Sequence, residues 1–125
     1  MKNFTILMGL FLATVITGSA FAQEIVAKRP DGLKAQVAVM KQEVPARFQC
    51  LIDDIKDRYP DSDDAEMKLF VLKKNVKAYW NIREANYPQD ILVEVLTRYE
   101  CDFDMVEFLV KKEIKAAKEL NSLLD

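Results

Sequence analysis

The chemistry of this chain of 125 residues is limited by its composition: it has two cysteines and no histidine. Histidine is the commonest general base, the commonest transition-metal ligand and the usual pH switch near neutrality. The few hydroxyl side chains therefore have no imidazole to activate them. A glycine-rich phosphate loop is excluded as well, because the whole chain holds three glycines. We predict a protein that is not an enzyme and that uses no cofactor.

An acidic segment that begins at Asp61 has some features of a calcium loop but lacks its defining residues. In such a loop the sixth residue is glycine and the twelfth is glutamate. Here those positions hold Glu66 and Leu72. Acids at the start of a helix explain the segment better, and we predict no metal site.

The first 22 residues have the pattern of a secretory signal peptide. Lys2 precedes an apolar run, and small residues at Ala20 and Ala22 suit a signal peptidase. The apolar run covers about 13 residues, whereas a membrane-spanning helix needs roughly 20. We therefore expect cleavage after Ala22 and export, to the periplasm in a Gram-negative cell and otherwise to the medium, with no membrane span.

Export places Cys50 and Cys101 in an oxidising compartment, where an even number of cysteines favours one intramolecular disulfide. The bond would close a loop of about 50 residues. A link between two chains is the alternative. On a helical projection Cys50 lies opposite the apolar stripe of its segment. We therefore expect the bridge on an outer flank of the fold, away from the core.

Acidic residues surround both cysteines, and the bridge would bring six carboxylates into one neighbourhood. These residues form the predicted acidic patch: Asp53, Asp54, Asp57, Glu100, Asp102 and Asp104. Such a patch suits a basic protein partner or a weakly held divalent cation. In the alternative interpretation, Asp102 and Asp104 cap a helix and the others are simply solvated.

Apolar residues recur every three or four positions from Leu33 onward, which predicts an all-α fold, a small bundle of four to five helices. Pro45, Pro60 and Pro88 interrupt the pattern, and the turn Glu100–Asp102 separates the last two helices. Residues 23–32 are expected to form a flexible mature N-terminus, and residues 33–125 a single helical domain. Expected N-terminal caps are Asp31, Asp63 with Glu66, and Asp104 with Glu107.

The third expected helix, from about Asp63 to Arg83, is apolar on two opposite sides. A helix of this kind is usually packed on both sides, so we predict that it is the central helix of the bundle. Tyr79 and Trp80 are then core residues, and the exposed strip holds Glu66, Lys73, Lys77 and Glu84.

The formal net charge of −2 does not suggest a nucleic acid as partner. A disulfide-tied fold with an acidic patch and no catalytic equipment favours a small exported protein-binding module, such as an inhibitor or an immunity protein of the cell envelope. A homodimer with a structural role is an alternative, in which Ala117, Leu120 and Leu124 of the last helix pair with a second chain.

In its arrangement the chain also resembles the small acid-stress chaperones of the periplasm, which are exported, helical and tied by one disulfide. Below about pH 4 the acids of this chain would be neutralised while its basic residues keep their charge, which would open the fold and expose apolar faces. A chain without histidine should titrate little between pH 5 and 8.

Overall fold

The computed structural model describes residues 28–125, so the predicted signal peptide 1–22 and the following residues 23–27 lie outside the described part. The described chain is all-α, as predicted, and its five α-helices are joined by short connections without a β-strand. They are α2 (Leu33–Glu43), α3 (Pro45–Arg58), α4 (Ala65–Ala85), α5 (Gln89–Arg98) and α6 (Phe103–Leu124), with a 3₁₀ helix at Ser62–Asp64.

The breaks between helices lie close to the residues that the sequence indicates. Pro45 both ends α2 and takes the first position of α3, where its missing N–H group leaves no helical hydrogen bond unmade. Asn86 ends α4 in a left-handed conformation, with φ of 54°. The predicted cap at Asp31 is wrong, because Gly32 is the N-cap of α2 and its φ of 88° suits a glycine.

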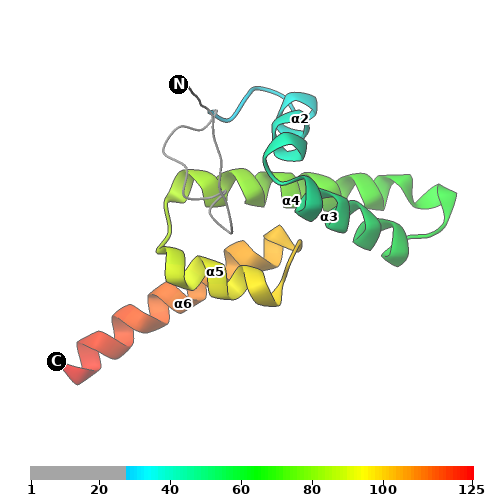
Figure 1. Cartoon of the computed structure of the whole chain (residues 1–125). Helices are drawn as coiled ribbons and strands as arrows, with labels where there is room; N and C mark the ends of the chain where they lie inside the picture. Colours follow the sequence, from blue (N-terminus) through cyan, green and yellow to red (C-terminus); the bar gives the residue numbers. More distant parts are fainter. Residues whose placement is uncertain (1–27) are drawn as a thin grey trace.

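The long helix α4 is the central helix, as predicted, because α2, α3 and α6 all pack against it. Figure 1 shows α3 beside the first half of α4, and α5 and α6 beside its second half. Helix α5 packs against α6. The C-terminal part of α6 extends away from the other helices.

The core lies where α4 meets α6. Tyr79 and Trp80 are fully buried, as predicted, and the Tyr79 ring lies edge-on to both Trp80 and Phe103, at centroid distances of 5.7 and 5.4 Å. Edge-on rings at these distances attract one another through their quadrupoles. Burial of large side chains from α4 and α6 therefore supplies much of the force that holds these helices together.

The first part of α4 does not pack on two sides, which corrects our prediction for that segment. Met67, Leu69 and Phe70 are 45%, 46% and 56% exposed. Helix α6 begins only at the level of Asn75, whose side chain accepts a hydrogen bond from the backbone of Asp104. The opposite side of the earlier turns of α4 is therefore open to solvent. The predicted polar strip, Glu66, Lys73, Lys77 and Glu84, is exposed.

In the expected flexible segment 23–32, Arg29 contacts α4 and Pro30 contacts α2. Arg29 donates a hydrogen bond to Asn81 at 2.8 Å and forms an ion pair with Glu84 at 2.9 Å. The carbonyl group of Pro30 accepts a hydrogen bond from Gln36. Arg29 and Pro30 are therefore connected to the helices by polar contacts.

Candidate functional site

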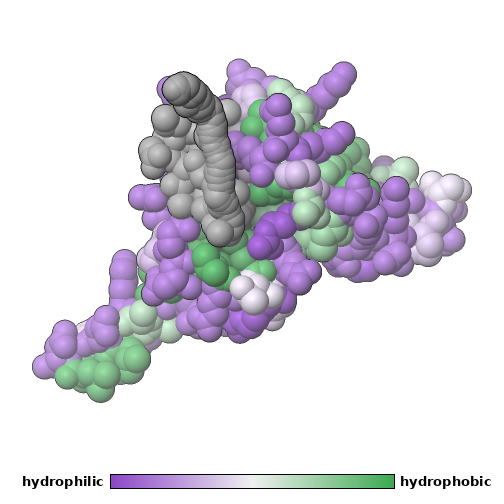
Figure 2. Space-filling model, in the orientation of Figure 1, coloured by the Kyte–Doolittle hydropathy of each residue, from purple (hydrophilic) through white to green (hydrophobic). Residues whose placement is uncertain are grey.

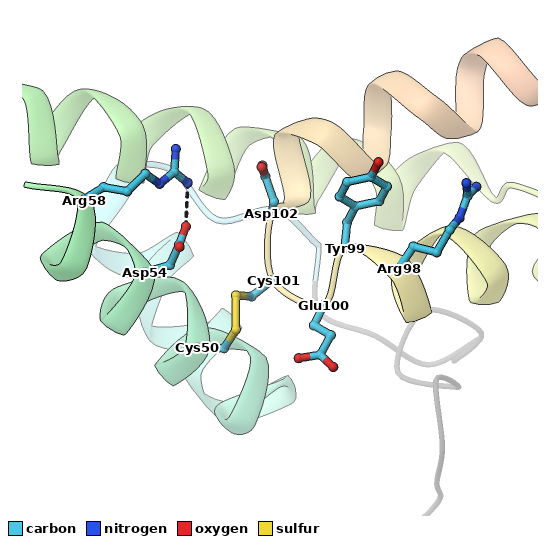
Figure 3. Close-up of a pocket in the computed structure, with 8 residues that line it drawn as sticks. All are labelled: Cys50, Asp54, Arg58, Arg98, Tyr99, Glu100, Cys101 and Asp102. Carbon is cyan, nitrogen blue, oxygen red and sulfur yellow. Dashed lines mark hydrogen bonds and ion pairs between the residues drawn. A yellow bond between two sulfur atoms is a disulfide. The ribbon is translucent and has the colours of Figure 1, made fainter.

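A disulfide joins Cys50 of α3 to Cys101 in the turn between α5 and α6 (Figure 3), which confirms the predicted intramolecular bridge. The two Cα atoms are 5.8 Å apart although 51 positions separate the residues in sequence. Cys101 is only 8% exposed and belongs to the core, and Cys50 packs against the core from the side. The expectation that the bridge lies away from the core is therefore wrong, because the turn carries Cys101 inward beneath α3.

An open hollow of about 380 Å³ lies next to the bridge. We call its lining the disulfide rim, and it consists of Cys50, Asp54, Arg58, Arg98, Tyr99, Glu100, Cys101 and Asp102. Figure 3 shows that these side chains come from α3 on one side and from the end of α5 and the following turn on the other. The disulfide thus holds two segments distant in sequence as one surface.

Three of the six predicted acidic residues line this hollow, and each has a different setting. Asp54 forms an ion pair with Arg58 one helical turn away, at 2.5 Å. Asp102 caps α6, because its side chain accepts a hydrogen bond from the backbone N–H of Met105 at 3.2 Å. The carboxylate of Glu100 has no hydrogen bond or ion pair within residues 28–125.

The other three acids of the predicted patch do not line the hollow. Asp53 accepts a hydrogen bond from Gln49 on the same helix, at 2.9 Å, and Asp57 is exposed. Asp104 forms an ion pair with Lys74 of α4, at 3.3 Å, so its charge is engaged at the α4–α6 junction. Asp102, not Asp104, is the residue that caps α6, which corrects the predicted pairing of Asp104 with Glu107.

Arginines also surround the bridge, and the sequence reasoning missed them. Arg47 donates a hydrogen bond to the carbonyl group of Glu100, which ties α3 to the turn beside the disulfide. The hydrogen bond to Asp54 raises the pKa of Arg58 above its ordinary value. Arg98 lies over the ring of Tyr99, 6.0 Å from its centroid. The disulfide rim is therefore a surface of mixed charge, and the four-residue spacing of Asp54 and Arg58 was the signal for it.

A second group of polar side chains lies between α2 and α4. Arg83 is 3% exposed in its side chain and forms an ion pair with Glu43 at 3.0 Å. Its guanidinium group lies 4.4 Å from the centroid of the Trp80 ring. The hydroxyl of Tyr79 donates a hydrogen bond to the same Glu43 carboxylate. Burial, and then this hydrogen bond, raise the pKa of Tyr79 well above its ordinary value.

The expected capping box of Asp63 with Glu66 is absent, because the chain forms a 3₁₀ turn at Ser62–Asp64 and α4 begins only at Ala65. The acids of this segment are exposed or half-buried. Within residues 28–125 no group of three or more potential ligands is arranged to hold a metal ion.

None of the helices in the described part of the chain combines the length and the apolar character that a membrane span requires. The disulfide rim is the candidate site among the described residues: an exposed, covalently fixed surface of mixed charge. In comparisons with protein families, curated proteins and solved structures, the chain gives no match.

Proposed function

We propose that this is an exported helical protein that binds another protein through the disulfide rim, in the manner of an inhibitor or an immunity protein of the cell envelope. One observation carries the proposal. The Cys50–Cys101 bond fixes the α5–α6 turn against α3, so that charged side chains from both segments border one hollow.

The Cys50–Cys101 bond preorganises the disulfide rim. A surface whose side chains are already fixed loses less conformational entropy when a partner binds than a mobile loop does. The hydrogen bond from Arg47 to the carbonyl group of Glu100 adds a second tie beside the disulfide. A protein that acts by covering a partner needs shape and charge, and it needs no catalytic group.

The charges of the disulfide rim, and of Asp57, which precedes Arg58 on α3, determine which partner surface fits. Asp57 and Glu100 are exposed acids without an ion pair among the described residues, whereas Arg58 and Arg98 bring positive charge to the same region. Complementarity then requires a partner surface that is mainly basic and that carries at least one acid opposite an arginine. The partner class is a protein, because an open hollow of this kind encloses little of a small molecule.

Affinity capture from a cell-envelope extract tests the proposal, with the oxidised protein immobilised and the captured protein identified. The variant Asp57→Lys/Glu100→Lys reverses two exposed charges of the region. It should weaken binding of the identified partner by at least about tenfold, since rim charges steer association and favour one register. The captured complex should also weaken as the salt concentration rises.

The matched control is Glu66→Lys/Glu119→Lys, which changes the net charge equally at exposed positions that do not line the hollow. This control should bind as the wild type does. Equal loss in both variants would mean that net charge alone governs binding. If Asp57→Lys/Glu100→Lys binds the partner as the wild type does, the disulfide rim is not the binding surface.

An acid-stress chaperone is a second candidate function, and the pair Glu43–Arg83 favours it. This pair joins α2 to α4 beside Trp80, so the contact between the two helices depends on charge. Loosening of α2 from α4 would then uncover Trp80, the only tryptophan. Aggregation of an acid-denatured client at about pH 3 tests this function, with Trp80 fluorescence as the readout of opening. A protein that stays folded at that pH, or that gives no protection, excludes it.

A further inference from the structure

The second half of α6 is a helix with an uncovered apolar face. From Lys111 onward every residue of α6 is exposed except Ile114, which is half-buried. Leu120, Leu123 and Leu124 are 55%, 78% and 75% exposed. Figure 2 shows a hydrophobic surface at the end of this projecting helix. Apolar side chains gathered on a projecting element mark a surface for association.

The exposed face continues the face that α6 uses inside its own domain. Phe103, Val106 and Val110 are fully buried and alternate in steps of three and four residues. The same steps lead onward through Glu113 to Ala117, Leu120 and Leu124, which have no helix over them in the described chain. We call this stripe of α6, from Phe103 to Leu124, the seam. Its first part is packed within the domain, and its second part is open to solvent.

We propose that the open part, residues 113–124, packs against the same segment of a second copy, with the two helices antiparallel. The positions that flank the seam are uncharged: Ile114, Ala116, Asn121 and Leu123. The lysines of this segment lie outside the seam and stay in water. A self-complementary patch of this kind closes into a dimer with twofold symmetry.

The fold of each copy decides the direction of pairing. In a parallel pair the second helix would continue along Val110, Val106 and Phe103, where helices of the same copy already lie. An antiparallel pair keeps the contact on the open part. In the register with the longest overlap, Ala117 faces Leu120 of the second copy, and Glu113 lies opposite Leu124 at either end.

Glu113 is the single acid on the seam, and it favours a second copy of the chain over a lipid surface as the partner of the open part. Glu113 lies at the first position of the open face but on its centre line, so a helix lying flat with that face in a bilayer would bury the carboxylate without a partner. In the antiparallel pair Glu113 lies at the end of the overlap, where water reaches it. In a parallel pair the two Glu113 carboxylates would face each other, which is unfavourable.

The predicted dimer is weak, because the contact is short. The open part, residues 113–124, is about 18 Å long, and a contact of this size falls in the class of transient interfaces. Sedimentation equilibrium of the purified protein alone should give a monomer–dimer equilibrium with a dissociation constant of about 10 to 100 μM.

The variant Leu120→Glu/Leu124→Glu should be monomeric up to about ten times that concentration, because it places charge on the seam. The control Lys115→Glu/Ser122→Glu changes the outer face and should leave the dimer intact. Both variants should keep the circular dichroism of the wild type, because these side chains are exposed. A wild type that remains monomeric at 1 mM, or a seam variant that still dimerises, overturns the proposal.

Spin labels test the direction separately. Cysteines introduced at Lys111 or Lys118 are labelled without a reductant, so that the native disulfide stays closed. In the antiparallel register the Lys118 labels lie near the twofold axis, whereas the Lys111 labels are displaced by about 22 Å along the helices. Equal distances between the two labels at position 111 and at position 118 would mean a parallel pair and would contradict the antiparallel register. Binding to vesicles of anionic lipid without dimerisation would identify a membrane as the occupant and refute the second copy.

Discussion

Glu43 at the end of α2 and Arg83 near the end of α4 form an ion pair at 3.0 Å across the interior of the domain. The Arg83 side chain is 3% exposed and that of Glu43 is 21% exposed. The Glu43 carboxylate also accepts a hydrogen bond from the hydroxyl of Tyr79. One acid therefore joins two residues of α4 to α2, which is a short helix with a single fully buried side chain, Met40.

We predict that Glu43→Gln lowers the free energy of unfolding by about 2 kcal/mol at pH 7. Removal of one partner of a fully buried ion pair costs more, about 3 to 5 kcal/mol, and the partial exposure of Glu43 reduces the effect. Glutamine keeps an oxygen for the hydroxyl of Tyr79, so the change reports mainly the lost charge. Urea unfolding measures the difference.

The control is Glu84→Gln, which also removes the charge of a glutamate but from an exposed ion pair, the one with Arg29. That change should cost less than about 1 kcal/mol, because solvent screens exposed pairs. Equal costs for the two variants would mean that the Glu43–Arg83 pair gains nothing from its burial.

The raised pKa of Tyr79 predicts a loss of stability at alkaline pH. Burial and the hydrogen bond to Glu43 hold the proton on Tyr79 in the folded state, whereas an unfolded tyrosine releases it near pH 10. The stabilisation is therefore complete below about pH 10 and falls as the pH rises, at most by about 1.4 kcal/mol per pH unit. Urea unfolding between pH 8 and 11.5 measures it.

Tyr79→Phe is the matched variant for this pH dependence. At pH 7 it should be less stable by about 1 kcal/mol, because the hydrogen bond to Glu43 is lost. Above pH 10 the advantage of the wild type should shrink, since the phenylalanine has no proton to lose. A difference that stays constant up to pH 11.5 would contradict the raised pKa.

The helices were predictable because each is bounded by a strong local signal. Pro45 and the pair Tyr59–Pro60 mark helix ends through backbone sterics alone, and the apolar steps within each helix depend on the same chain segment. The capping residues were less predictable. A short acid serves as a cap only if the helix begins right after it, and α4 begins beyond Asp63 because of the 3₁₀ turn.

The candidate site was predictable only in part, since its geometry depends on tertiary contacts. The disulfide and the proximity of Asp54 to Glu100 follow from cysteine pairing. Nothing local indicates that Arg47 reaches the carbonyl group of Glu100, or that Lys74 draws Asp104 toward α4. A polar residue at an apolar position, such as Asn75 between Leu72 and Tyr79, was the sequence signal of a buried polar contact.

The disulfide should supply a large share of the stability. Its partners are 51 positions apart, and a loop of this length corresponds to about 4 kcal/mol in the chain-entropy model. We predict that reduction of the wild type lowers the free energy of unfolding by about that amount. Because Cys101 is buried, Cys50→Ala/Cys101→Ala also loses packing and should be slightly less stable than the reduced wild type. A loss below about 1 kcal/mol on reduction would show that the turn holds to α3 without the bond.

Asn75 and Asp102 satisfy neighbouring backbone groups at the start of α6, and their substitutions should therefore interact. The Asn75 side chain is 3% exposed, donates to the carbonyl group of Val71 and accepts the N–H of Asp104. Asp102 accepts the N–H of Met105. We predict a cost of about 2 kcal/mol for Asn75→Ala, which takes this partner from the half-buried N–H of Asp104. The cap variant Asp102→Ala should cost about 1 kcal/mol.

In the double variant the first turn of α6 should fray, so that the second substitution costs less than it does alone. A coupling of at least about 0.5 kcal/mol is expected for residues that support one turn. Asn121→Ala, at an exposed position of the same helix, is the control and should change the free energy of unfolding by less than about 0.5 kcal/mol. Strict additivity of Asn75→Ala and Asp102→Ala would mean that the two side chains act on α6 independently, and the start of α6 would then be fixed by the packing of Phe103.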